Sequence, residues 1–314
     1  LISAGIVDSE TASSFNLLQN NKTTNVVASN VSTNKRSADY QIIYDLITKA
    51  LLSAESSVEL PKNQYSKSFS DIVDIVEICL RENPEILYYK GFTYSPDGKL
   101  TFRYSKDRPT ILSHREKLEN KVNDILSQLI KPNMTDYQIE LAIHDYLVEN
   151  CEYDMDAVNG GEIKADSFTA YGALCLGVAV CEGYAEAASI LLNRSGVETK
   201  IITGTSKGVG HAWNLVKLDG EFYHLDVTWD DPIYKSDEKS GIRYHYFNLT
   251  DDDISIDHQW DKSKYEACTA TKYNYYKYNN LVVKDQDDYI KRVIDEVHKG
   301  NTKIELKILE PDPM

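Results

Sequence analysis

The sequence predicts an α+β protein, and two observations support this fold class. Residues 181–194 repeat apolar side chains at helical spacing, which predicts an amphipathic helix with Cys181 in its first turn. Two β-prone runs, 211–218 and 222–229, flank Asp219-Gly220-Glu221, and an Asp-Gly pair favours a tight hairpin turn. We therefore expect a helix that carries a cysteine to pack on an antiparallel sheet that carries a histidine and an aspartate.

The N-terminal third divides into a polar segment and a small folded region. Residues 1–36 contain sixteen Ser, Thr or Asn and one aromatic residue, a composition typical of a linker or tether. Residues 37–133 predict a smaller α+β lead-in region. Its expected elements are helices over 38–50, 69–81 and 113–130 and a hairpin over 86–104 that turns at Ser95-Pro96-Asp97-Gly98.

The rest of the chain divides into a core, residues 134–262, and a C-terminal extension, residues 263–314. Thr135 and Gln138 form a capping box that opens an amphipathic helix. On that helix His144 and Asp145 fall on the outer face and are interpreted as a solvated pair. The extension predicts a strand over 280–283, a helix over 285–298 and a strand over 303–309.

Composition excludes several classes of function. The chain has 314 residues, and 34 Lys and Arg against 49 Asp and Glu give a net charge of −15. Such an acidic protein is a poor partner for nucleic acid or an anionic membrane, because both attract cationic surfaces. No apolar run reaches the roughly 18–20 residues that a membrane-spanning helix needs. The five cysteines are an odd number without a CxxC pair, which argues against a disulfide scaffold and against a zinc ribbon.

The hairpin brings a histidine and an aspartate together. With Asp219 and Gly220 as the turn residues, Leu218 pairs with Glu221, and the same register places Trp213 opposite Asp226 and His211 opposite Thr228. His211, Trp213, His224, Asp226 and Thr228 then share one face of the hairpin. His211 and Asp226 become diagonal neighbours within hydrogen-bonding reach.

A cysteine at a helix N-terminus beside a His–Asp pair is the arrangement of a nucleophile, its base and the group that orients the base. The N-terminal end of a helix favours the reactive thiolate. Each residue also has a structural interpretation when taken alone. Cys181 would be a buried structural thiol, His211 a hydrogen-bonded structural histidine and Asp226 a strand-end carboxylate. All three coinciding by accident is much less common, so the sequence favours thiol catalysis.

Three ordered motifs extend this interpretation. They are the segments 177–185 (Gly-Val-Ala-Val-Cys-Glu-Gly-Tyr-Ala), 210–214 (Gly-His-Ala-Trp-Asn) and 224–232 (His-Leu-Asp-Val-Thr-Trp-Asp-Asp-Pro). Together with flanking motifs over 142–147, 170–174 and 246–250, they resemble the transglutaminase-core superfamily across residues 134–262, and most of all its bacterial transglutaminase/protease-like branch. The resemblance implies a papain-like thiol fold in which Cys181, His211 and Asp226 are the catalytic triad.

The implied reaction is acyl transfer through a thioester, resolved by an amine (cross-linking) or by water (hydrolysis). An oxyanion hole would use the Cys181 backbone N–H and one further donor, for which Tyr171 is a candidate. Trp213 and His224 are further candidates around the triad. No metal and no cofactor are expected, because Thr250 before Asp251-Asp252-Asp253 is better explained as an N-cap with an acidic first turn than as a calcium loop.

The expected function is therefore a thiol-dependent enzyme acting on protein or peptide amides. The alternative is a catalytically silent binding or scaffold module that keeps the fold. The expected partner is a protein or peptide substrate, and the residues leave the oligomeric state open. The polar tether and a chain that begins at Leu1 suggest an exported, extracellular or cell-surface piece of a longer bacterial protein.

Overall fold

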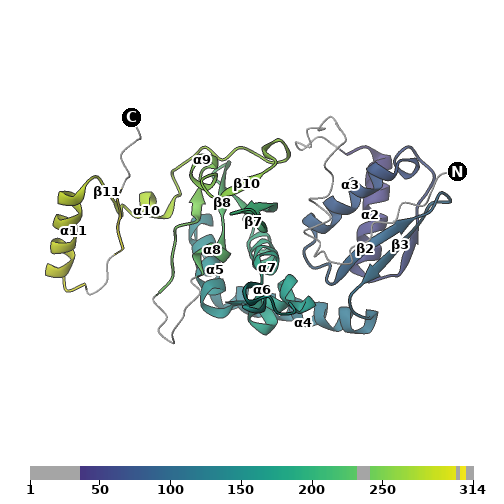
Figure 1. The fold of residues 1–314 in the computed structure, drawn as a ribbon, viewed down its shortest axis with the longest axis horizontal. Helices are drawn as coiled ribbons and strands as arrows, with labels where there is room; N and C mark the ends of the chain where they lie inside the picture. Colours follow the sequence, from purple (N-terminus) through teal and green to yellow (C-terminus); the bar gives the residue numbers. More distant parts are fainter. Residues whose placement is uncertain (1–35, 232–240, 302–304, 309–314) are drawn as a thin grey trace.

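The computed structural model describes residues 36–231, 241–301 and 305–308 and arranges them as three parts along one axis (Figure 1). An N-terminal unit stands at one end, a larger body of helices and strands lies in the middle, and a short strand–helix–strand unit stands at the other end. The expected α+β fold class is confirmed by this mixture of helices and antiparallel strands. Of the predicted linker only Arg36 is among the described residues. The division into four segments stays a prediction.

The N-terminal unit has its own hydrophobic core. Two helices, α2 (Ala38–Leu52) and α3 (Phe69–Glu82), pack beside a three-stranded antiparallel sheet. In sheet order its strands are β1 (Ser57–Glu59), β3 (Lys99–Tyr104) and β2 (Tyr89–Tyr94). Ser37 and Ser68 cap the two helices through their side chains, because short hydroxyl side chains satisfy the free N–H groups of a first turn. The hairpin predicted over 86–104 is present as β2 and β3.

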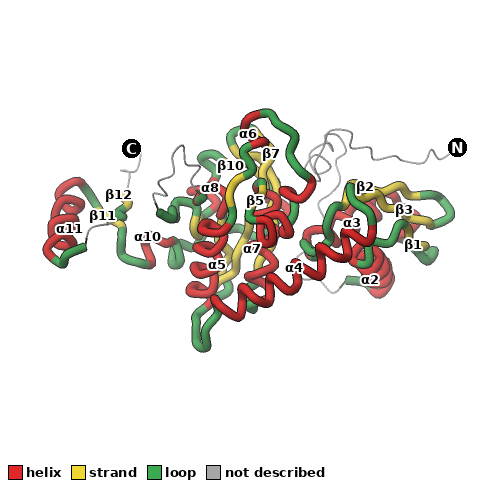
Figure 2. The backbone as a smooth tube through the Cα atoms, turned by 90° about the horizontal axis from the view of Figure 1, so that it is seen from below, coloured by secondary structure: helices red, strands yellow, loops and turns green. Residues whose placement is uncertain are grey.

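Helix α4 (Arg108–Leu129) leads from this unit to the central body, as Figure 2 shows from below. It begins five residues earlier than the predicted Ser113. The Asp107 side chain accepts a hydrogen bond from the backbone N–H of Thr110, and Pro109 suits the first turn because its missing N–H is not needed there. The apolar pattern alone shows where the helix packs, whereas its cap decides where it begins.

The central body contains a five-stranded sheet in which all neighbouring strands are antiparallel. In sheet order the strands are β10 (His258–Trp260), β6 (Thr199–Ser206), β7 (Val209–Leu218), β8 (Glu221–Leu225) and β9 (Phe247–Leu249). Asp219 and Gly220 have φ angles of 51° and 87°, as a tight primed turn requires. Leu218 therefore pairs with Glu221, which is the predicted register.

Two helices cover this sheet, α5 (Asp136–Asn150) and α7 (Cys181–Arg194). Helix α7 has the predicted bounds, and the predicted capping box opens α5. Ala185 of α7 packs on Ile201 and Ala212 of the sheet, and the Asn214 side-chain amide donates to the Ala185 carbonyl at 3.0 Å. Small side chains allow the cysteine-bearing helix to pack closely on the sheet, and a buried hydrogen bond fixes its position there.

Short elements fill the connections. They are η1 (Tyr65–Lys67), β4 (Glu152–Tyr153), α6 (Asp156–Asn159), η2 (Ala165–Phe168), η3 (Gly172–Leu176), β5 (Val178–Ala179), α8 (Val227–Asp230), α9 (Asp251–Ile254), η4 (Lys262–Lys264) and α10 (Tyr275–Tyr278). Strands β4 and β5 pair in parallel, which places Tyr153 beside Ala179, two residues before Cys181.

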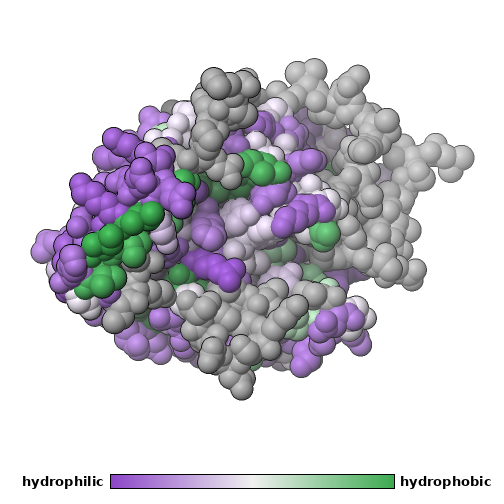
Figure 3. Space-filling model, turned by 60° about the vertical axis from the view of Figure 1, so that its left-hand side comes forward, coloured by the Kyte–Doolittle hydropathy of each residue, from purple (hydrophilic) through white to green (hydrophobic). Residues whose placement is uncertain are grey.

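The C-terminal unit consists of β11 (Val282–Val283), α11 (Gln286–His298) and β12 (Lys307–Ile308), and the two strands pair in parallel. Ile290, Ile294 and Val297 of α11 are exposed. Figure 3, drawn with this end of the molecule forward, shows apolar patches on a mostly hydrophilic surface. No helix among the described residues is long and apolar enough to cross a membrane.

Gly183, in the first turn of α7, leaves no room for a side chain. A Cβ atom there would lie 2.8 Å from the Ser167 carbonyl oxygen and 2.9 Å from the Thr169 carbonyl oxygen. Gly183→Ala should therefore lower the free energy of unfolding by about 1–3 kcal/mol, because backbone atoms must move. Chemical denaturation measures this change. A gain in stability of up to about 1 kcal/mol, as Gly→Ala gives at an open helical site, would contradict the tight packing.

Candidate active site

Cys181 is the first residue of α7 and is 9% exposed. The Val180 backbone before it is extended, and its N–H donates to the Ser167 carbonyl at 2.9 Å, so the preceding loop holds the start of the helix. No side chain caps this N-terminus. Backbone N–H groups of a first turn have no partner within the helix and favour an anion placed beside them. The Cys181 thiol thus lies beside backbone N–H groups that have no partner within the helix.

His211 and Asp226 form the predicted pair. Nε2 of His211 donates to Oδ2 of Asp226 at 2.6 Å, and the two residues are 5% and 1% exposed. Burial raises the pKa of Asp226, but the charge and hydrogen bond of His211 and the hydrogen bond of His258 outweigh it and bring that pKa down to about 2. The carboxylate is therefore ionised at neutral pH.

Cys181 is a further partner of His211. Burial lowers the pKa of His211, whereas the charge and hydrogen bond of Asp226 and a hydrogen bond and charge from Cys181 raise it to about 10. The imidazolium form of His211 is therefore favoured at neutral pH, with Asp226 on one ring nitrogen and Cys181 as a further partner. The structure brings together the three residues that the sequence singled out.

The route to this pairing differs from the predicted one at its last step. The ladder between β7 and β8 ends at Asn214 and Leu225, so the expected pairs Trp213–Asp226 and His211–Thr228 do not form. The physical reason is a helix cap. Oδ1 of Asp226 accepts the Trp229 backbone N–H at 3.2 Å, which starts helix α8 and places Thr228 inside it. Asp226 reaches His211 from this helix start rather than from a strand.

Trp213 and His224 lie next to the triad in supporting roles. The Trp213 ring stacks beside His211 with centroids 5.6 Å apart, and its Nε1 donates to Nδ1 of His224 at 3.0 Å. Nε2 of His224 lies 2.8 Å from Oδ1 of Asp251. Burial lowers the pKa of His224 despite the charge of Asp251, which favours a neutral ring. Both nitrogens are thus engaged in structural hydrogen bonds, and His224 is not placed as the base.

The Tyr171 side chain packs in the hydrophobic core rather than in a position for the oxyanion hole. Its ring stacks on His114 of α4 at 4.0 Å, and its side chain is part of the main hydrophobic core. Tyr153, which the sequence analysis missed, lies near Cys181 at the start of α7. Burial raises its pKa to about 12, helped by the charges of Cys181, Asp154 and Asp226. No local signal marks Tyr153, because the β4–β5 pairing alone brings it beside the start of α7.

His144 is not the solvated residue that its helical position predicted. It is fully buried, with Nε2 3.2 Å from Oδ2 of Asp230 and Nδ1 3.0 Å from Oδ1 of Asp145. The prediction was wrong because α5 is covered on more than one side, and the face expected to meet water meets α8 and Phe247 instead. Oδ1 of Asp230 also accepts the Tyr246 backbone N–H, so this pair anchors the segment that carries Asp226.

Two clusters among the described residues have the composition of metal sites, His211–Asp226–His258 and His224–Asp251–Cys268. In the second, Trp213 and Asp251 use both nitrogens of His224, and a metal would have to displace one of these hydrogen bonds. Thr250 caps α9, as its sequence predicts, and the structure adds a capping box with Asp253. The carboxylate of Asp251 accepts from the Cys268 backbone N–H, so it too is used structurally.

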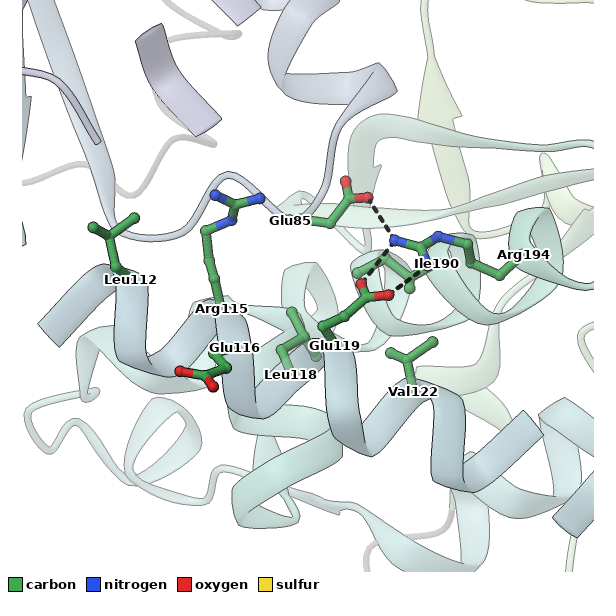
Figure 4. Close-up of a pocket in the computed structure, with 9 residues that line it drawn as sticks. All are labelled: Glu85, Leu112, Arg115, Glu116, Leu118, Glu119, Val122, Ile190 and Arg194. Carbon is green, nitrogen blue, oxygen red and sulfur yellow. Dashed lines mark hydrogen bonds and ion pairs between the residues drawn. The ribbon is translucent and has the colours of Figure 1, made fainter. Parts of the chain in front are cut away.

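Two surface pockets lie outside the triad. One, of about 370 Å³, lies between α4, Glu85 and the end of α7, where Arg194 forms ion pairs with Glu85 and Glu119 (Figure 4). The other, of about 490 Å³, is nearer to the triad. It is lined by Thr205, Lys207, Gly208, Ile256, Asp257 and Gln259. Because Asp257 precedes His258, this second pocket adjoins the cluster of His211, Asp226 and His258.

The His144–Asp230 pair makes a prediction about pH. Burial lowers the pKa of His144, but Asp145 and Asp230 raise it to about 9, compared with about 6.5 in an unfolded chain. A group with a raised folded pKa stabilises fully below its unfolded pKa, and this stabilisation is lost as the pH rises through the folded value. The contribution of His144 should therefore be complete below pH ~6.5 and disappear as the pH rises through ~9.

Asp230→Asn should remove most of that contribution and cost about 3–5 kcal/mol at pH 6, because the buried charge of His144 loses its fully buried partner and keeps only Asp145. Urea denaturation at pH 6 and pH 9 measures both effects, and the difference between the two pH values should shrink but not vanish, since His211 also titrates. Asp145→Asn, at a partly exposed partner of the same ring, should cost less. An unchanged pH dependence in Asp230→Asn would refute the assignment.

Comparisons with known proteins give the following similarities. The chain is 27% identical to kyphoscoliosis peptidase of Mus musculus and of Homo sapiens over 161 residues, which cover 43% of this chain and 24% of each relative. It thus spans about a quarter of the length of these relatives. A transglutaminase crystal structure is similar with 15% identity and a TM-score of 0.34, covering 43% of this chain and 37% of that one. Residues 123–227 match the family model of the transglutaminase-like superfamily and form a domain of that superfamily.

Proposed function

We propose that this protein is a thiol-dependent acyl-transfer enzyme that acts on protein or peptide amides. The observation that carries the proposal is the buried 2.6 Å hydrogen bond between His211 and Asp226, with Cys181 as a further partner of the same imidazole. A superfamily of thiol enzymes with this order of residues supports it. Burying ionised groups costs free energy that apolar packing would not cost. Buried charges of this kind are therefore typical of functional sites.

The first half of the reaction forms a thioester. The Cys181 thiolate attacks the amide carbonyl carbon, and the carbonyl π electrons move onto oxygen. His211, as imidazolium, donates its proton to the leaving nitrogen when the C–N bond breaks, and an amine or ammonia departs. Asp226 stays ionised throughout and stabilises the cationic ring.

The second half resolves the thioester. An incoming amine or water loses its proton to His211 as it attacks the thioester carbonyl, and the C–S bond breaks to restore the Cys181 thiolate. An amine acceptor gives a new amide, which is cross-linking when both partners are proteins, whereas water gives a carboxylic acid. The triad is the same for both outcomes, so access of the acceptor to the thioester decides between them.

The oxyanion of each tetrahedral intermediate needs two donors. The Cys181 backbone N–H at the start of α7 is the first. We assign the second to the Tyr153 hydroxyl rather than to Tyr171. The support is the position of Tyr153 beside the start of α7 and its raised pKa of about 12, which keeps the hydroxyl protonated and able to donate.

Cys181→Ala should abolish activity and leave the fold intact, since Ala suits a helical position. The assay incubates the protein with a Gln-rich protein substrate, with and without a labelled primary amine. Incorporated label reports transfer, and new carboxyl groups or cleaved peptide bonds report hydrolysis. A wild-type protein that gives neither product and whose Cys181 resists thiol-directed probes would support the silent scaffold instead.

Cys175→Ala is the matched control. This partly buried thiol lies six residues upstream, and burial raises its pKa, so it is a poor nucleophile. Its substitution should leave the rate within about twofold of wild type, the size of an ordinary surface effect. Activity that survives Cys181→Ala and disappears in Cys175→Ala would show that the nucleophile is assigned wrongly.

Tyr153→Phe should lower kcat by about 10²-fold with a small effect on KM, because an oxyanion donor acts in the transition state. Tyr171→Phe is the control and should change kcat little, since the Tyr171 ring stacks on His114. Steady-state kinetics of the two variants measure the contrast. Equal losses in both variants would remove Tyr153 from the oxyanion hole.

A further inference from the structure

The proposed triad does not account for His258, the first residue of β10. Nε2 of His258 lies 3.0 Å from Oδ2 of Asp226, the same oxygen that accepts from His211 at 2.6 Å. Its other nitrogen, Nδ1, lies 2.5 Å from Oδ1 of Asp257, whose second oxygen accepts the Tyr246 hydroxyl. A continuous series of hydrogen bonds therefore runs from His211 through Asp226 and His258 to Asp257 and Tyr246.

The surroundings of His258 exclude water. The residue is 1% exposed, and its ring contacts Trp213 at 5.0 Å, Trp229 at 5.3 Å and Tyr246 at 5.6 Å between centroids. No solvent can replace a donor that is lost from Asp226 at this depth, and a buried carboxylate left short of a donor is costly. Losing the hydrogen bond from His258 would therefore destabilise the buried Asp226 carboxylate.

The geometry also limits how Asp226 can turn. Oδ1 is held by the Trp229 backbone N–H, while Oδ2 receives the two histidine N–H groups. A carboxylate held at both oxygens cannot rotate about its Cβ–Cγ bond, so Oδ2 stays in line with the His211 ring. Catalytic groups lose rate steeply when such alignment is relaxed.

We propose that His258 is a positioning residue that fixes Asp226 for His211, an inference that rests on the proposed acyl-transfer function. The hydrogen bonds of His258 go to two carboxylates, Asp226 and Asp257. His258 donates to Asp226 and is itself oriented by Asp257, which lines the 490 Å³ pocket at the surface. The charged or titratable groups around its ring are His211, His224, Asp226, Asp257 and Tyr246.

A matched pair of substitutions isolates the bond to Asp226. In His258→Gln the amide N–H takes the place of Nε2–H and keeps the donor to Asp226. In His258→Asn the shorter amide takes the place of Nδ1 and faces Asp257 instead. Both variants remove the same ring and the same titratable group, so a packing or charge role predicts equal effects, and a positioning role predicts unequal ones.

Two readouts test the pair. The first is the rate of Cys181 alkylation by iodoacetamide at pH 7, which needs no substrate and has Cys175 as an internal reference. His258→Gln should stay within about threefold of wild type and His258→Asn should fall by about tenfold or more, as for a lost hydrogen bond to a charged group. The second is the NMR signal of the His211 ring N–H, which should persist in His258→Gln and broaden or shift upfield in His258→Asn.

Equal alkylation rates and unchanged His211 signals in the two variants would overturn the positioning role. Should His258→Asn fail to fold, Asp257→Asn carries the same test from a partly exposed site, and an alkylation rate equal to wild type would overturn the proposal. Failure of the proposed function gives a different result. Cys181 of the wild-type protein would then react no faster than Cys175, whatever the state of the His211 signal.

Discussion

The ionised carboxylate of Asp226 is the constraint on which the central body depends. Its side chain is fully buried, and it is stable there because three donors reach it from three places: His211 on β7, His258 on β10 and the Trp229 backbone in α8. A buried charge needs such partners, since each missing donor leaves desolvation uncompensated. The antiparallel order of the sheet and the turn into α8 are therefore tied to one carboxylate.

Buried polar pairs behind the site hold these donors in place. His144 of α5 and Asp230 of α8 join these two helices. The Asn248 side-chain amide donates to Glu140, also on α5, at 2.8 Å. Gly183 lets the first turn of α7 approach the backbone of residues 167–169, so the thiol is fixed by close packing rather than by a side-chain cap. Precise placement of this kind is what the proposed two-step acyl transfer would require.

Much of the site could be predicted because its signals are local. The stripe over 181–194 and Asp219-Gly220 fixed α7 and the hairpin register, and the motifs around Cys181, His211 and Asp226 supplied the resemblance to a thiol family. The extracellular or cell-surface localisation remains a prediction, because the composition of residues 1–36 is its main support. Cross-linking and hydrolysis share one triad, so residue types alone do not separate them.

The sequence by itself determined helix α7, the hairpin turn and the order of Cys181, His211 and Asp226 along them, because helical period, strand alternation and turn chemistry act over a few residues. Only the tertiary structure decided that Asp226 acts from a helix cap, that His144 is buried, and that Tyr153 and His258 stand beside the triad. Those placements arise from contacts between segments far apart in the sequence, such as His144 with Asp230, which are 86 residues apart. Burial and pairing over such distances depend on how the helices and strands pack. This packing produces no periodic pattern in the sequence.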